Sequence, residues 1–197
     1  MTPHRSTAFL AAALLALYAP GLAGQESPLI LEVHGGLAAP IGSFRDGSGD
    51  GEGAAPGASL SVDFVLTGQG RRGLYAGFSQ HRFGCEDAGC SAGGRYVATG
   101  FDVGFRFKLR REGDAIPWIR IGGITTRMET DDLGGANVGV SDLGFGGEVG
   151  AGVHIGGASP LAISPGVRFA AVSSTLPGGS SLGLRYLVVQ VAAVLAF

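Results

Sequence analysis

Only a few residues have side chains whose type and spacing could support catalysis. Ser181 stands in the pentapeptide Gly-Ser-Ser-Leu-Gly over 179–183, which matches the G-x-S-x-G pattern of serine hydrolases. In those enzymes the serine lies where a strand turns sharply into a helix. Here a Gly/Ser segment leads into an apolar stretch with the period of a strand. We therefore predict a loop at Ser181 and no catalytic residue.

The histidines are a second candidate for acid–base chemistry. His81 follows Ser79 by two residues, so a strand would point both side chains to the same face. That face, which also carries His34, is assigned below to the interior of the fold, and His154 is expected near one end. A hydrolase acting on a membrane lipid needs its serine, histidine and acid at the membrane surface. We therefore expect no catalysis by His81 and Ser79.

Acidic residues gather in two segments that could bind a cation. The segment from Asp46 to Glu52 opens like a calcium-binding EF-hand loop, but its twelfth position, where a bidentate acid is required, is Gly57. A second acidic group lies between Glu129 and Asp142. We interpret both segments as solvated loops and predict no metal site and no cofactor.

The first residues predict export from the cytoplasm. Arg5 precedes an apolar run over 8–19 that is too short to span a bilayer, and small residues of the kind read by signal peptidase follow it. We predict a cleaved signal peptide over 1–24 and one domain over 25–197.

Export gives the two cysteines a role. Cys85 and Cys90 lie in a polar, Gly-rich stretch and would close a small loop in an oxidising compartment. A zinc site would need four ligands at tighter spacing. We therefore predict a Cys85–Cys90 disulfide.

Composition narrows the classes of fold and partner. The chain has 37 Gly among 197 residues, 45% hydrophobic residues and a formal net charge of -2. The apolar content is too high for a disordered chain. Nucleic acid is not an expected partner, because the chain is not basic and has no Lys/Arg stripe. Each interior Gly would cost a helix about 1 kcal/mol relative to Ala, which disfavours a helical fold.

Alternation of apolar with small or polar residues is the strongest pattern, and period two is the period of a strand. The predicted strands are Leu29–Ile41, Ala58–Thr67, Leu74–Phe83, Val97–Leu109, Trp118–Met128, Phe145–Ile155, Leu161–Ser173 and a last one that ends at Phe197. Their connections alternate between long (42–57, 84–96, 129–144) and short, as in outer-membrane barrels. The predicted fold class is all-β, an eight-stranded antiparallel up-and-down transmembrane β-barrel.

The two faces of these strands decide what surrounds the barrel. One face is almost free of charge and the other carries charged and tiny residues, so lipid is expected outside and charge inside. Eight strands leave just enough room for side chains to fill the interior, and unpaired buried charges cost several kcal/mol each. We therefore predict a salt-bridged plug without a continuous pore. Its expected members are Glu32, Asp63, Asp102, Arg106, Lys108, Arg120, Glu148 and Arg168.

One residue conflicts with this pattern. Pro165 falls inside the seventh predicted strand, yet a closed barrel has no free edge for a residue without an N–H. We predict either a bulge near the rim or a strand that begins after Pro165.

Two local features carry a family resemblance: the terminal strand ending in Phe197, and the segment Pro-Ile-Gly-Ser-Phe over 40–44 that closes the first strand. With them the chain resembles the OmpA/OmpX-like eight-stranded barrels of the Gram-negative outer membrane. The resemblance implies an integral, monomeric outer-membrane protein whose partners are outer-membrane lipid and, during biogenesis, the barrel-assembly machinery, which would read Phe197.

The expected function is non-enzymatic: a structural, adhesion or surface-interaction role through the long loops. Some small barrels of this class modify lipid A, so a lipid A-modifying enzyme is the first alternative. A narrow channel for small hydrophobic solutes is the second.

Overall fold

The computed structural model describes residues 29–46, 53–67, 71–85, 94–110, 112–131, 137–156, 159, 161–175 and 181–197. The predicted signal peptide over 1–24 and Cys90 lie outside these residues, so both stay predictions. Within the described segments, no helix is long and apolar enough to cross a membrane.

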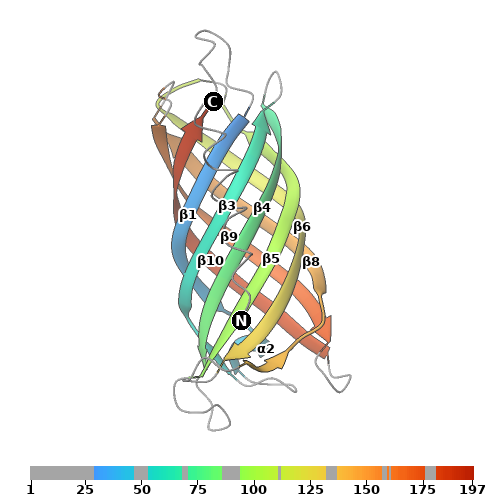
Figure 1. The fold of residues 1–197 in the computed structure, drawn as a ribbon. Helices are drawn as coiled ribbons and strands as arrows, with labels where there is room; N and C mark the ends of the chain where they lie inside the picture. Colours follow the sequence, from blue (N-terminus) through green and yellow to red (C-terminus); the bar gives the residue numbers. More distant parts are fainter. Residues whose placement is uncertain are drawn as a thin grey trace, which may run out of the picture.

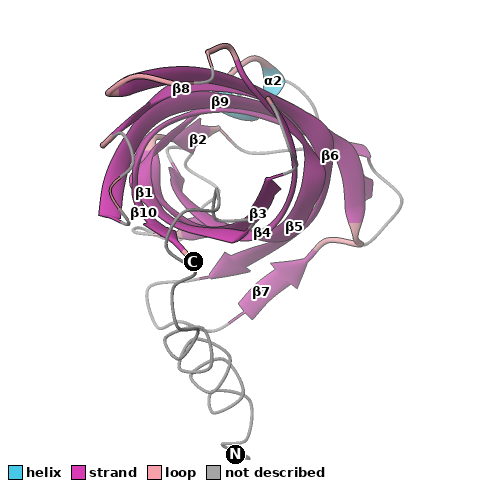
Figure 2. Ribbon diagram, turned by 90° about the horizontal axis from the view of Figure 1, so that it is seen from above, coloured by secondary structure: helices cyan, strands magenta, loops and turns pink. Residues whose placement is uncertain are grey.

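Eight long antiparallel strands close into a barrel (Figures 1 and 2). They are β1 (Leu29–Pro40), β3 (Gly57–Thr67), β4 (Arg72–Cys85), β5 (Arg95–Lys108), β6 (Ala115–Asp131), β8 (Gly144–Ile155), β9 (Leu161–Thr175) and β10 (Ser181–Ala196). Each strand pairs with the next, and β1 pairs with β10 to close the ring. The predicted fold class is confirmed.

The two ends of the barrel differ. One end, called here the turn end, carries the short connections, the start of β1 and the end of β10. The other, the loop end, carries three short elements: the helix α2 (Ser43–Asp46), β2 (Ala54–Ala55) on β4, and β7 (Asn137–Val140) on β6. The strands also run further toward the loop end than alternation predicts, because ladder hydrogen bonds continue where the outward residues become polar. The predicted loops at 84–96 and 129–144 are therefore partly sheet.

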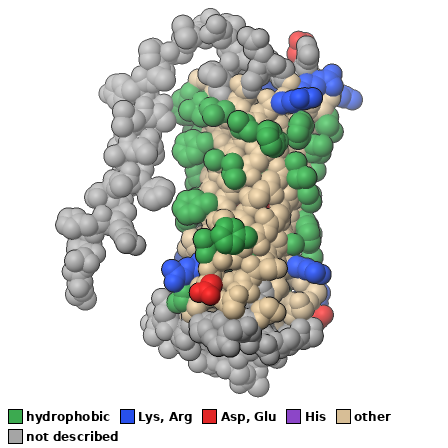
Figure 3. Space-filling model, turned by 90° about the vertical axis from the view of Figure 1, so that its right-hand side faces the viewer, with side chains coloured by type: hydrophobic (Ala, Val, Ile, Leu, Met, Phe, Trp, Pro, Cys, Tyr) green, Lys and Arg blue, Asp and Glu red, His purple; other side chains and the backbone are tan. Residues whose placement is uncertain are grey.

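The outer wall is apolar over its middle. Outward side chains such as Leu37, Phe101 and Phe145 are 65%, 62% and 66% exposed, while inward neighbours such as Ala38 and Asp102 are buried. Figure 3 shows hydrophobic side chains over the wall, with charged ones near its two ends. Large apolar faces of this kind mark contact with a non-aqueous surface.

Pro165 lies within β9 without a bulge. It pairs with Val191 of β10, and the pairing of β8 with β9 keeps one register from Gly152 opposite Gly166 to Ile155 opposite Ile163. The two positions between these pairs are missing from the β8–β9 ladder. Both predicted solutions are therefore wrong: the barrel tolerates the missing N–H as a short gap in one ladder.

The buried side chains of the interior lie in layers along the barrel axis. Seven charged residues on six strands occupy the middle and are called here the charged layer. Toward the loop end lies an apolar cluster called here the loop-side plug, whose large members are Phe44, Phe83, Tyr96, Met128, Leu184 and Tyr186. Toward the turn end Trp118, Ala162, Ala192 and Val194 are buried.

Candidate functional site

The charged layer brings together inward side chains that are far apart in sequence. Its members are Glu32 (β1), Asp63 (β3), Asp102 and Arg106 (β5), Arg120 (β6), Glu148 (β8) and Arg168 (β9). All seven are buried. Charges removed from water to this degree are stable only when paired.

Arg120 is the centre of the layer. Its Nη1 donates to Asp63 Oδ2 over 2.6 Å, its Nε donates to Glu148 Oε1 over 3.0 Å, and Nη2 contacts the same Glu148 oxygen. The guanidinium also lies 4.2 Å from the centre of the Tyr75 ring, whose hydroxyl donates to Glu148 over 2.7 Å. One arginine thus links strands β3, β4, β6 and β8.

A second arginine completes the ionic contacts. Arg168 Nη1 lies 3.1 Å from Asp102 Oδ2 and 3.4 Å from Glu148 Oε2, and Asp102 Oδ2 is also 3.6 Å from Arg120 Nη2. The pairs on neighbouring strands, Asp102 with Arg120 and Glu148 with Arg168, therefore lie in contact. Each belongs to a shared network rather than to an isolated bridge.

Arg106 connects the layer to the turn end. It contacts Glu32 through a short ion pair, and its guanidinium lies 4.3 Å from the centre of the Trp118 ring. The indole N–H of Trp118 donates to Ser164 Oγ over 2.9 Å. Trp118 thus holds the Arg106 guanidinium in place on the turn-end side of the layer.

Lys108 stands apart from the network it was expected to join. It is the last residue of β5, at the turn end, and is partly exposed. Alternation places its side chain on the inward face, but its height on the barrel is that of the rim. Among the described residues no ion pair links it to the charged layer.

His34 lies beside Glu32 and Asp63, where a cation could stand in addition to the three arginines of the layer. Its Nε2 lies 3.3 Å from Glu32 Oε2 and 3.2 Å from Asp63 Oδ2, and Gln190 Nε2 lies 2.9 Å from its Nδ1. Glu32, His34 and Asp63 form a group whose ligand atoms lie within 4.8 Å of one another, so a metal ion could fit by distance. Arg106 and Arg120 already hold the two carboxylates, and their positive charges oppose a further cation.

Glycines opposite the charged residues make room for them. A Cβ on Gly77 would collide with the carboxylates of Asp63 and Asp102, and one on Gly150 would come within 3.0 Å of Arg120 Cγ. The long charged side chains therefore fit only because the residues opposite them on the neighbouring strands are glycines.

His81 has a serine partner, but not the one next to it in sequence. Its Nδ1 lies 2.9 Å from Ser59 Oγ, across the β3–β4 pair, and its Nε2 lies 3.2 Å from Arg168 Nη2. An arginine only donates, so Nε2 accepts and the ring proton sits on Nδ1, pointing at the serine. A general base must accept the serine proton. This pair is therefore set in the wrong tautomer to activate a nucleophile.

The other predicted residues lie at the ends of the barrel. Cys85 ends β4, with its sulfur 3.7 Å from the Tyr96 hydroxyl oxygen; the disulfide stays a prediction because Cys90 is not described. Phe197 follows β10 and donates its N–H to the Leu29 carbonyl over 3.0 Å. Its role as an assembly signal is also untested. Ser181 was predicted in a loop, but it is the first residue of β10, paired with Thr175, and is exposed. His154 lies near the turn end of β8.

The loop-side plug was not predicted. Phe44 of α2 folds back into the mouth, is 4% exposed, and packs edge-on against Phe83 with ring centres 5.1 Å apart. Tyr96 lies 6.0 Å from the same ring. The only sequence signal for this plug was the aromatic residue Phe44 in the segment that closes the first strand. In that segment alternation no longer predicts whether a side chain points inward or outward.

Comparison with known proteins identifies the fold. No protein-family model matches the chain, and no curated protein is similar enough in sequence to count as a relative. Among solved structures, Neisserial surface protein A (NspA) matches with a TM-score of 0.65 and 14% identity, covering 88% of this chain and 99% of that one. Ail, the attachment invasion locus protein of Yersinia pestis, matches with a TM-score of 0.48 and 13% identity, covering 86% and 99%. The chain thus has the small-barrel fold seen in NspA.

Proposed function

We propose that this chain is an integral protein of the bacterial outer membrane, where it has a non-enzymatic structural or surface-interaction role. The observation that carries the proposal is the outer wall. Over the middle of the closed barrel its apolar side chains are exposed all round, while the seven residues of the charged layer are buried inside. Only a hydrocarbon environment removes the cost of that arrangement, because a barrel in water buries its apolar residues. NspA, which shares the fold, is a surface protein by name.

The interior supports a role that does not involve transport or catalysis. The charged layer and the loop-side plug place buried side chains in the lumen at two successive levels, which favours a role other than that of a solute channel. The Ser59–His81 tautomer argues against the alternative of a lipid A-modifying hydrolase. Interaction through the predicted loops at 42–57, 84–96 and 129–144 is then the function that the fold supports best.

Membrane insertion is tested by cell fractionation followed by electrophoresis with and without boiling. We expect the protein in the outer-membrane fraction, migrating differently before and after boiling, because a closed barrel resists detergent unfolding. A soluble periplasmic protein whose migration does not change would contradict the proposal.

The surface role is tested through the predicted disulfide. We expect the double variant Cys85→Ser, Cys90→Ser to keep the mobility shift on boiling but to lose part of the binding of expressing cells to immobilised host-cell surfaces. Cells that carry Arg185→Gln, a change on the outer wall of β10, serve as the matched control. Unchanged binding by the cysteine variant would overturn a role for this loop.

A further inference from the structure

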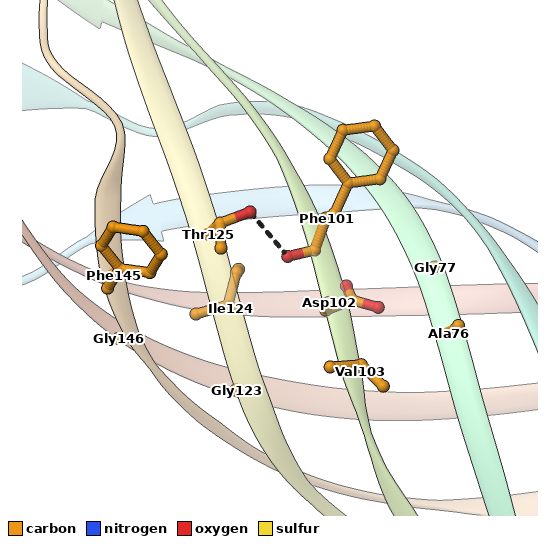
Figure 4. A pocket seen from close by; sticks show the side chains of 10 residues that line it. All are labelled: Ala76, Gly77, Phe101, Asp102, Val103, Gly123, Ile124, Thr125, Phe145 and Gly146. Atoms are coloured by element: carbon orange, nitrogen blue, oxygen red, sulfur yellow. Dashed lines mark hydrogen bonds between the residues drawn. The ribbon is translucent and has the colours of Figure 1, made fainter.

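The outer wall of the barrel has a hollow across four neighbouring strands (Figure 4). The hollow has a volume of about 420 Å³, within the range of small-ligand pockets. Its walls are the outward side chains of Ala76, Phe101, Val103, Thr125 and Phe145, with backbone of the residues between them. Phe101 and Phe145 stand on either side of β6 with the smaller Thr125 between them, and beside Thr125 the floor over Gly123 carries no side chain (Figure 4).

Two outward glycines create the hollow. Gly123 of β6 lies directly opposite Gly147 of β8, so neither strand places a side chain on the wall there. A Cβ added to Gly123 would meet only the Gly146 carbonyl, at 3.9 Å, and one on Gly147 only the Gly122 carbonyl, at 3.6 Å. The inward neighbour Gly122 differs, because a Cβ there would collide with the Tyr75 hydroxyl. The barrel therefore needs Gly122 for its own packing but does not need Gly123.

A cation stands beyond the lining residues, on the loop side of the hollow. Arg127 is the next outward residue on β6 after Thr125, about 7 Å further along the strand, and it is exposed. Glu129 is the outward residue beyond it, so the side of Arg127 that faces the hollow carries no acid on β6. An apolar groove that ends in an arginine matches a molecule with a hydrocarbon chain and an anionic head.

We propose that this hollow binds one acyl chain of a phosphorylated membrane lipid in the leaflet nearest the loop end, with the lipid phosphate on Arg127. The proposal rests on the membrane location proposed above. The chain would lie over Gly123 and Gly147, between Phe101 and Phe145, and the guanidinium would bind phosphate oxygens in a bidentate way.

A second copy of the barrel fits this surface less well than a lipid. Two copies related by a two-fold axis would bring the same patch together, and with it Arg127 near Arg127. A convex barrel wall would also leave the hollow unfilled. A flexible acyl chain has neither difficulty.

The test measures lipid binding to the purified, refolded protein by native mass spectrometry from detergent micelles. The probes are dimyristoyl phosphatidic acid and, as the zwitterionic control, dimyristoyl phosphatidylcholine. We expect one phosphatidic acid to be retained in preference to phosphatidylcholine. Arg127→Gln should weaken phosphatidic acid binding about fivefold, as expected for one arginine near a lipid surface. Gly123→Leu, which fills the hollow without a backbone collision, should weaken the binding of both lipids.

Arg185→Gln is the matched control for charge, because Arg185 is an outward, exposed arginine on β10, three strands from β6. Its binding should equal that of the original chain. Every variant must first show the mobility shift on boiling and insertion into vesicles. Failure of the original chain to insert would overturn the membrane proposal itself. A folded chain that binds lipid equally with and without Gly123→Leu would overturn only the site, as would a dimer that Gly123→Leu dissociates.

Discussion

The charged layer and the loop-side plug occupy the same barrel interior with different interactions. In the layer, each carboxylate contacts an arginine from another strand, and Arg120 alone reaches Asp63, Asp102 and Glu148. In the plug, aromatic and aliphatic side chains pack around Phe44, which enters from α2 rather than from a strand. The layer thus couples strands to one another, whereas the plug couples the mouth to a connecting segment. Loss of a residue should have different consequences in the two regions.

The largest effect is expected in the layer. Arg120→Met should lower the free energy of unfolding by about 3–5 kcal/mol, because it leaves three buried carboxylates short of a partner. Urea unfolding in lipid vesicles, followed by the loss of the mobility shift, measures this change. Arg185→Met, on the outer wall, is the control and should change stability little. Equal losses for both variants would mean that the layer does not act as a network.

A smaller loss is expected in the plug. Phe44→Ala should lower the free energy of unfolding by about 3 kcal/mol, at the lower end for buried aromatic residues, because α2 lies at the mouth and can readjust. The same variant should show no steady single-channel conductance in planar bilayers, since the charged layer still fills the lumen. Stable conductance in Phe44→Ala would show that the plug alone closes the barrel.

The smallest change in stability is expected at two adjacent glycines beside the layer, and it should differ between them. Gly122→Ala should lower the free energy of unfolding by about 1–3 kcal/mol, because its methyl group displaces Tyr75. The Tyr75 ring stacks on Arg120, and its hydroxyl donates to Glu148. Gly123→Ala, one residue away on the outer wall, should be close to neutral. Thermal unfolding of the two variants, monitored by gel mobility, gives the comparison. A neutral Gly122→Ala would show that Tyr75 is not held in place.

Sequence alternation predicted which face each residue takes, and this was enough for the fold and for most of the charged layer. It did not predict depth along the barrel axis. Lys108 has the inward parity of Arg106 but lies at the rim, and His34, which was expected inside, proved to stand between Glu32 and Asp63. Contacts such as Arg120 with Asp63 cross the lumen between strands that are not neighbours. They depend on barrel geometry, which a single strand pattern does not contain.

Phe44 was missed for another reason. It lies past the end of β1, where the chain reverses and neither the period of a strand nor that of a long helix applies. The conflict at Pro165 was recognised, but both predicted solutions were wrong. The β8–β9 ladder lacks two pairs there, while the β9–β10 ladder keeps its register.

The seam between β1 and β10 joins parts of the chain that are far apart in sequence. Ile30 pairs with Ala196, so the ring closes between the first and the last described strands. Gln190 reaches His34 across 156 residues of chain, and Arg106 reaches Glu32 across 74. Contacts of such long sequence separation form slowly, because the loop-closure entropy must be overcome first. Glu32 and Asp63 therefore gain their arginine partners only after β5 and β6 have joined the sheet, so neutralisation of the inward acids is coupled to assembly of the barrel rather than to the formation of any single hairpin.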